Sequence, residues 1–282
     1  MASPRSPTSP TAQAPQTPRP PGPTRTVVFG YDLTPQLEKL PAPIQRVVAL
    51  VLTAQFAWFA GHVLTVWYSV WYILLRTPHF YSRALLGTIL SYGIVLYKSY
   101  HSTFTPSDPN FRARISRDEN LHYVLLALLW YLSNPLFPLL VPFATFSLFH
   151  VLTYTRTHIL PNISPSLSGT VSPTLLKIVR DYQPVAIRAV AKYEIAVLTP
   201  LLIVGVFLRS VSLVQPVMFV QFLRQRWVFS ATARQAVREV RSVLDGALNG
   251  SPLYVRAVGL LERLLESILP DGGPGGSSGR AQ

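Results

Sequence analysis

The chain contains a run of 29 residues, 47–75, without a single acidic or basic side chain. A helix needs about 20 mostly apolar residues to cross the roughly 30 Å hydrocarbon core of a bilayer, so this run is long enough to span it with some tilt. Residues 120–155 form a second charge-free run, and in residues 195–223 only Arg209 is charged. A soluble domain would place charged side chains along the solvent-facing sides of such helices. The sequence therefore predicts an integral membrane protein.

The composition limits what this membrane protein can do. Hydrophobic residues make up 49% of the chain and charged residues 13%, which fits several membrane helices with polar ends. The absence of cysteine excludes disulfides, thiolate metal sites, cysteine nucleophiles and palmitoylation. The net charge of +13 is carried by side chains beside the apolar segments and in the tails. This placement favours anionic lipid head groups as partners and argues against nucleic acid.

The two ends of the chain differ from its middle. Residues 1–26 hold eight prolines and no apolar segment that could act as a cleavable signal, so we expect a disordered Pro-rich tail and insertion through the first membrane helix. Residues 27–223 are predicted to form a membrane domain of helical hairpins. A C-terminal amphipathic region, 224–270, and a disordered tail, 271–282, are expected to follow.

The first hairpin is predicted from two apolar segments. Residues 47–75 form its first helix, with aromatic residues in the far half as expected near head groups. Residues 84–97, bounded by Arg83 and Lys98, form the second. Fourteen helical residues cover only about 21 Å, so this segment either spans a thinned bilayer or forms a shallow hairpin arm.

Prolines divide the remaining apolar runs. We expect two arms at about 119–132 and 138–155, because Asn134 and the prolines that follow it break the helix. Residues 156–184 are predicted to be a polar connection, with a new helix starting near Pro184. That helix is expected to enter the membrane past Glu194, to turn near Arg209 and Ser210, and to return through residues 211–223.

The basic residues favour one orientation for these hairpins. With a cytosolic N-terminus, the far-side turns carry only Arg76, Arg83 and Arg209, and the other 22 of the 25 basic residues face the cytosol. This bias predicts three hairpins with both termini in the cytosol. A three-span arrangement that inverts one end is the alternative.

Two amphipathic helices are predicted at the C-terminus, over residues 232–248 and 252–269. Each has an apolar stripe too narrow to span a membrane but suited to lying in the interface. The residues expected to bind the membrane are Arg234, Arg238, Arg241, Val237, Val240, Leu244, Leu261, Leu264, Leu265 and Ile268. In the alternative interpretation the two helices pack on each other as a small cytosolic unit.

No pattern for catalysis, cofactor binding or metal binding is found. The six histidines lack metal-ligand spacing, and His62 and His150 are expected to be hydrogen-bonded packing residues. Phosphate-binding and hydrolase motifs are absent. Glu194 is the only carboxylate near a membrane segment and is a candidate functional group on that ground alone. The sequence thus predicts neither an enzyme nor a small-molecule substrate.

An ordered set of segments resembles the transmembrane protein 33 family, which includes fungal pore-membrane proteins. The segments are FYSRALLGTILSYGIVLY (80–97), FSLFHVLTYT (146–155), YEIAVLTP (193–200) and VSLVQPVMFVQFLRQRW (211–227). The likeness covers roughly residues 80–270, whereas the Pro-rich N-terminus departs from it and the first helix matches only in type. The resemblance implies a non-enzymatic protein of the endoplasmic reticulum and nuclear envelope that shapes membrane or supports nuclear pore complexes. Pore scaffold or reticulum-shaping proteins are its implied partners.

Two other classes of function are weighed against this one. A channel, a transporter or a regulator of ion homeostasis would explain the proline-broken helices, but buried acids and an inverted repeat are lacking. A membrane-bound lipid enzyme is disfavoured by the missing nucleophile and metal patterns.

Overall fold

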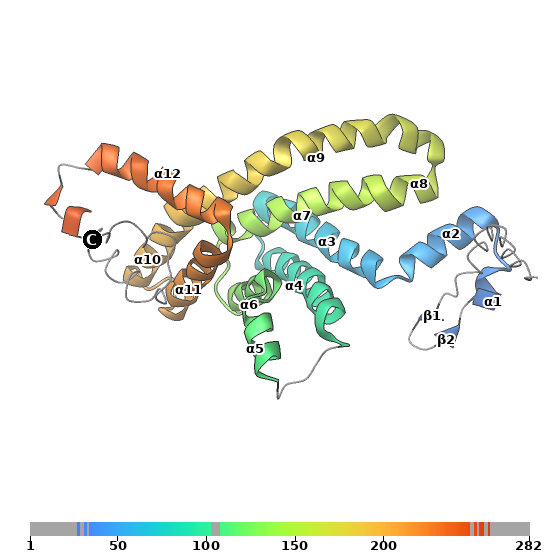
Figure 1. The fold of residues 1–282 in the computed structure, drawn as a ribbon, viewed down its shortest axis with the longest axis horizontal. Helices are drawn as coiled ribbons and strands as arrows, with labels where there is room; N and C mark the ends of the chain where they lie inside the picture. Colours follow the sequence, from blue (N-terminus) through green and yellow to red (C-terminus); the bar gives the residue numbers. More distant parts are fainter. Residues whose placement is uncertain are drawn as a thin grey trace, which may run out of the picture. The chain divides into compact units, whose positions relative to one another are not determined.

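The computed structural model describes residues 27–28, 31–32, 34–102, 108–248, 251–252, 254–256 and 259. The predicted disordered tails, 1–26 and 271–282, lie outside these residues. The chain divides into two compact units, Met1–Leu50 and Val51–Gln282. The described residues are almost entirely helical, which confirms the predicted all-α fold (Figure 1).

The first unit contains short elements. Strands β1 (Val27–Val28) and β2 (Tyr31–Asp32) pair antiparallel, with Val28 opposite Tyr31. Helix α1 (Thr34–Leu37) follows, and α2 (Ala42–Val51) runs to the end of the unit.

The first predicted membrane helix is shorter than its charge-free run. Helix α3 spans Ala54–Leu75, and the earlier part of the run belongs to α2. The two helices are separated at Thr53, whose extended backbone and side-chain oxygen cap α3 by accepting the Phe56 N–H at 3.0 Å. The prediction of one helix over 47–75 was therefore wrong, because absence of charge does not determine where a helix is capped.

The second arm of the first hairpin is longer than predicted. Helix α4 spans Pro78–Tyr100, 23 residues, and includes both Arg83 and Lys98. The prediction of a 14-residue segment was wrong because basic side chains bound an apolar stretch without ending a helix. The turn between α3 and α4 depends on Arg76, whose left-handed backbone (φ 55°) lets its N–H reach the Tyr72 carbonyl.

The second hairpin agrees with the prediction. Helix α5 (Pro109–Ser116) precedes α6 (Glu119–Tyr131), and a turn then leads into the short 3₁₀ helix η1 (Phe137–Leu140) and α7 (Val141–Tyr154). The Arg76 guanidinium lies 5.1 Å from the centre of the Phe137 ring, so the turns of the first two hairpins are neighbours.

The predicted polar connection over 156–184 is helical, which is the largest correction. A π-helical turn, η2 (Thr155–Ile159), and α8 (Leu160–Ile163) continue α7, and α9 (Pro165–Tyr193) starts at Ser164 rather than near Pro184. Proline fits the first turn of a helix, as Pro165 does, but Pro173 and Pro184 lie inside α9. Packing of α9 against α7, α8 and the C-terminal helix outweighs the local cost of these two prolines.

The third hairpin begins at a second π-helical turn, η3 (Glu194–Leu198), and continues through α10 (Thr199–Phe207). Each π turn ends two residues before a proline, Pro161 or Pro200, whose missing N–H favours a wider turn in the residues before it. The predicted turn at Arg209 is confirmed, since its φ is 56°. Helices α11 (Val214–Phe229) and α12 (Ala231–Leu248) follow.

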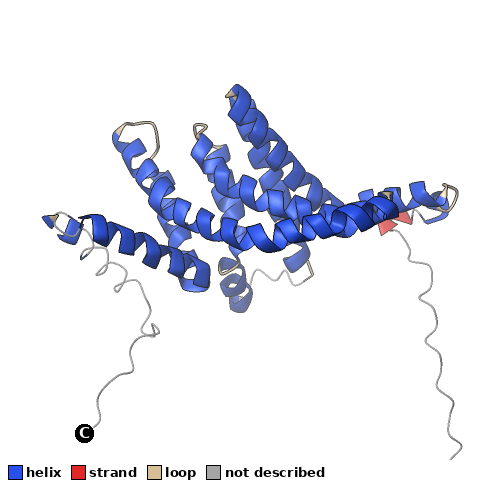
Figure 2. Cartoon of the chain, turned by 90° about the horizontal axis from the view of Figure 1, so that it is seen from above, coloured by secondary structure: helices blue, strands red, loops and turns tan. Residues whose placement is uncertain are grey.

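Three continuous helical stretches among the described residues are long and apolar enough to cross a membrane: Ala54–Leu75, Phe137–Ile163 and Pro165–Phe207. In Figure 2 the turns of the three hairpins lie at one side of the second unit, and α9 and α12 run across the other side.

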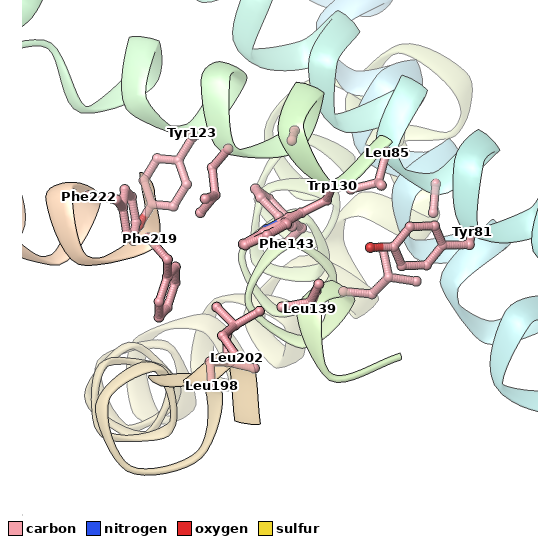
Figure 3. Close-up of a cluster of buried hydrophobic side chains, with 14 of the residues drawn as sticks. Tyr81, Leu85, Tyr123, Trp130, Leu139, Phe143, Leu198, Leu202, Phe219 and Phe222 are labelled. Carbon is pink, nitrogen blue, oxygen red and sulfur yellow. The ribbon is translucent and has the colours of Figure 1, made fainter. Parts of the chain in front are cut away.

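One hydrophobic core joins the three hairpins (Figure 3). Tyr81 and Leu85 of α4 meet Trp130 of α6, and Phe143 of α7 lies beside them. The third hairpin contributes residues from both of its arms to this core: Leu198, Leu202, Phe219 and Phe222. The hairpins are thus packed as a single helical bundle.

Candidate membrane-binding site

Helix α12 lies on the side of the bundle opposite the hairpin turns, which we call the base (Figure 2), and among the described residues its apolar face is buried at its beginning and exposed further along. Ala233 and Ala236 are buried where α12 packs on α9. Further along the same face Val243 is 71% exposed and Leu244 41% exposed, and Leu248 is also exposed. The second half of α12 therefore presents an open apolar stripe, which we define as Val243, Leu244 and Leu248.

Polar contacts fix the beginning of α12 to α9. Lys192 of α9 forms an ion pair with Glu239, and the Gln235 side-chain amide donates to the same carboxylate at 2.7 Å. The hydrogen bonds from Lys192 and Gln235 lower the pKa of Glu239. The carboxylate is thus kept in its charged form, and the first half of α12 is held alongside α9.

The basic side chains of α12 differ in what they contact. The Arg234 guanidinium donates to the carbonyls of Trp227 and Val228, at 3.1 and 3.0 Å, so it caps the end of α11. Arg241 lies 3.5 Å from Asp245, one turn along. Arg238 is exposed on the polar side of α12, away from the stripe. Of the three predicted basic residues, Arg241 borders the open stripe, Arg238 lies on the exposed polar side of α12, and Arg234 is engaged by the protein.

The remaining predicted residues fall into two groups. Val237 and Val240 are half-buried on the apolar face, between the covered and open parts of α12. Leu261, Leu264, Leu265 and Ile268 lie outside the described residues. Tyr254, from the expected second helix, donates a hydrogen bond to Asp245 at 2.6 Å, and this bond raises the pKa of Tyr254.

Helix α9 forms a second surface at the base of the bundle, one that the sequence reasoning missed. One side of it packs on α7 and α8, and its exposed side chains include both apolar and basic residues. The exposed basic residues are Lys177, Arg180, Arg188 and Lys192. Their spacing is a helical signal that the prolines and serines of this region concealed.

A buried ion pair connects this base to the third hairpin. Glu194, 2% exposed, accepts a hydrogen bond from Arg226, 6% exposed. Glu194 lies in η3, where the helix leaves the base, and Arg226 lies near the end of α11. The Arg226 guanidinium also lies over the Phe222 ring, 5.8 Å from its centre. The sequence singled out Glu194, but not Arg226, which lies 32 residues away.

His62 is a hydrogen-bonded packing residue, as predicted, and His150 packs beside it through ring contacts. His62 Nδ1 lies 2.9 Å from the Ser147 hydroxyl, which joins α3 to α7. His150 packs against His62, with ring centres 4.6 Å apart, and against Trp58. No group of three or more potential metal ligands occurs among the residues that the structure describes.

The packed hairpins and the amphipathic helices at their base define a polytopic, all-helical integral membrane protein. Comparison with known families is consistent with this class. The chain belongs to the family Transmembrane protein 33/Nucleoporin POM33, whose profile matches residues 43–265. The resemblance seen in the sequence is confirmed.

Three relatives illustrate the extent of this similarity. Tetra-spanning protein 1 of Schizosaccharomyces pombe is 34% identical over 218 residues, which cover 71% of this chain and 78% of the relative. Pore membrane protein of 33 kDa of Saccharomyces cerevisiae is 28% identical and covers 73% and 79%, respectively. Transmembrane protein 33 of Homo sapiens is 27% identical and covers 75% and 90%. No solved structure matches the chain.

These findings determine location and broad class. The chain is a membrane protein of the endoplasmic reticulum and nuclear envelope, as predicted. The relatives are named as membrane or pore proteins and not as enzymes, which fits the absence of catalytic motifs from the sequence.

Proposed function

We propose that this protein stabilises strongly curved membrane in the nuclear envelope and endoplasmic reticulum, and that it supports nuclear pore complex assembly or distribution without catalysing a reaction. Two relatives are named Pore membrane protein of 33 kDa and Nucleoporin POM33, which supports a role at the pore. The observation that carries the proposal is the open apolar stripe of α12, with Arg241 at its edge and Arg238 exposed on the polar side of the same helix.

The stripe suits shallow insertion into one leaflet. An amphipathic helix with an apolar face and flanking basic residues lies in the interface plane, with its apolar side chains about 5–10 Å deep among head groups and acyl chains. Inserted there, α12 increases the area of the leaflet that it enters. The bilayer is then expected to bend so that this leaflet lies on the convex side. Because its beginning is bound to α9, this wedge is coupled to the hairpins.

The third hairpin supports the same conclusion. Beyond the base, the first arm consists of the 5 residues of η3 and the 9 of α10, and the second arm, α11, has 16 residues; each arm by itself is below the roughly 20 that a spanning helix needs, although α9 continues the first arm without a break. Such a hairpin occupies more of the leaflet at its base than of the opposite leaflet. The wedge of α12 and the short hairpin therefore act in the same direction.

The expected partners follow from charge and family. The exposed basic residues of α9 and α12 suit anionic head groups, each contributing about 1 kcal/mol near such a surface. We propose that pore scaffold or membrane-shaping proteins of the reticulum bind the same protein, at surfaces outside the bilayer.

The test compares two double variants of the full-length protein in liposomes of mixed size that contain anionic lipid. Leu244→Asp with Leu248→Asp places two charges on the open stripe, and enrichment in small vesicles should be lost. Ser242→Asp with Gly246→Asp adds the same charge to exposed positions on the other side of α12 and should keep most of the enrichment.

Three readouts decide the outcome. Vesicle size is measured for each protein by electron cryomicroscopy, and pore distribution is followed in cells with a labelled scaffold protein. Equal curvature preference in the two double variants would refute the wedge. Solute flux through wild-type proteoliposomes without any effect on vesicle shape would favour a channel instead.

A further inference from the structure

A groove of about 570 Å³ opens between α10 and α11 on the outer side of the third hairpin. Its lining is apolar except for Gln221, and it includes Ile203, Phe207, Leu213, Val217 and Val220. The volume falls within the roughly 300–1,000 Å³ typical of ligand sites.

The groove exists because each arm of the hairpin packs on the core through its other side. Leu198 of η3 and Leu202 of α10 are buried in the core, and so are Phe219 and Phe222 of α11 (Figure 3). The sides that face away from the core are exposed, with Phe207 at 82% and Leu213 at 66%. The two arms are therefore positioned by the bundle, and the space between them stays open.

A cationic side chain continues the α11 side of the groove. Leu213, Val217 and Val220 recur at spacings of four and three, and the next residue on this face is Arg224. No side chain among the residues that the structure describes forms an ion pair with Arg224. Trp227 follows one turn later, and tryptophan is enriched at the level of lipid head groups.

The length of this face matches one leaflet. The 11 helical steps from Leu213 to Arg224 rise by about 16 Å. Half of the roughly 30 Å hydrocarbon core is about 15 Å. A phospholipid with its phosphate at Arg224 would therefore extend an acyl chain along the groove toward the hairpin turn.

We propose that the α10–α11 groove binds one anionic glycerophospholipid, with an acyl chain against the apolar lining and the phosphate paired with Arg224. Basic residues at the mouths of apolar clefts between membrane helices bind such head groups. This inference goes beyond the proposed function, because the site requires neither α12 nor membrane curvature.

The test uses the full-length protein purified in detergent and incubated with equal amounts of phosphatidylserine and phosphatidylcholine of the same chain length. Retained lipid is counted by native mass spectrometry. Wild-type protein should retain one phosphatidylserine molecule in preference to phosphatidylcholine. Arg224→Gln should reduce this preference about five-fold, which corresponds to the roughly 1 kcal/mol of one basic residue near an anionic surface. Arg224→Glu should reverse the preference.

Matched variants separate the site from general lipid binding. Val220→Trp fills the groove and should remove the retained lipid regardless of head group, whereas Ile73→Trp, on the exposed side of α3, should not. Arg188→Gln, an exposed basic residue of α9, should keep the preference. Each variant is used in this comparison only if its thermal unfolding temperature matches that of the wild-type protein.

Three outcomes would overturn the proposal. The first is an unchanged head-group preference in both Arg224 variants. The second is loss of the preference in Arg209→Gln, because the head group would then lie at the hairpin turn. The third is a Val220→Trp protein that still retains the lipid but no longer forms a dimer that the wild-type protein forms. This result would assign the groove to an interface between two copies of the chain.

Discussion

Gly61 and Gly87 are the residues that allow α3 and α4 to pack closely. A Cβ atom on Gly87 would lie 2.6 Å from the Gly61 carbonyl oxygen and 2.8 Å from the Thr65 amide nitrogen. The Thr65 and Thr88 hydroxyls are 3.1 Å apart at the same contact. Between membrane helices, small residues permit this approach and hydroxyls bond across it, because lipid offers no hydrophobic drive for helices to associate.

At the residue scale, Gly87→Ala should lower the stability of the first hairpin. The new methyl group meets two backbone atoms that cannot move aside, and overpacking of this kind costs about 1–3 kcal/mol. Gly93→Ala is the matched control, since nothing lies within 4 Å of its added Cβ. In a helix that exchange should be neutral or stabilising by up to about 1 kcal/mol. Thermal unfolding in one detergent measures both, and similar values for the two variants would contradict the close-packing interpretation.

At the scale of elements, the π turn η3 is where helix α9 of the base continues into the first arm of the third hairpin. Glu194 lies at this junction and pairs with Arg226, so the beginning of one arm is tied to the end of the other. Proline at position 200 provides the local reason for the wide turn, and the ion pair provides the tertiary one.

Removing one partner of this pair should destabilise the protein strongly. Glu194→Leu or Arg226→Met leaves an uncompensated buried charge, which typically costs about 3–5 kcal/mol. The double variant should recover most of the loss, because paired burial of charge is often no better than apolar packing. Arg180→Met and Asp181→Leu remove the exposed pair of α9 as a control and should each cost less than about 1 kcal/mol. Additive losses in the Glu194 and Arg226 double variant would mean that the two residues act independently.

At the scale of the molecule, the hairpin turns and the base carry different amounts of charge. Arg76, Arg83 and Arg209 are the basic residues at or near the turns, and the other described basic residues of the second unit lie at the opposite ends of the arms or in the helices that join and follow the hairpins. Cytosolic segments of membrane proteins carry the excess of lysine and arginine. The base, with α9 and α12, is therefore expected to face the cytosol together with both termini.

Single cysteines can test this orientation, because the native chain has none. Cysteines at Thr77, Asn134 and Ser210, in the turns, should react with a membrane-impermeant maleimide only after sealed microsomes are opened. Cysteines at Ser116, Ser166 and Ser242 should react without opening. Labelling of any turn position in sealed vesicles would require a different topology, such as the three-span alternative.

The sequence by itself determined the class of the protein and much of its outline. Long charge-free runs are incompatible with a solvated surface, so the membrane and the all-α fold followed from composition and order alone. The second hairpin was predicted because Asn134 and the following prolines interrupt an apolar run, and the turn at Arg209 because a single charge interrupts an otherwise uncharged one. The bounds of α12 followed from its helical periodicity and from Asn249-Gly250.

Only the tertiary structure decided which residues of these elements are covered. Helix α9 runs through Pro173 and Pro184 because neighbouring helices hold it, and no local pattern contains that contribution. The apolar face of α12 is uniform in sequence, yet only its first half packs on α9. Glu194 finds Arg226 through the packing of η3 against α11. Propensity and periodicity act within about one helical turn, whereas burial and ion pairing depend on segments brought together by the whole fold.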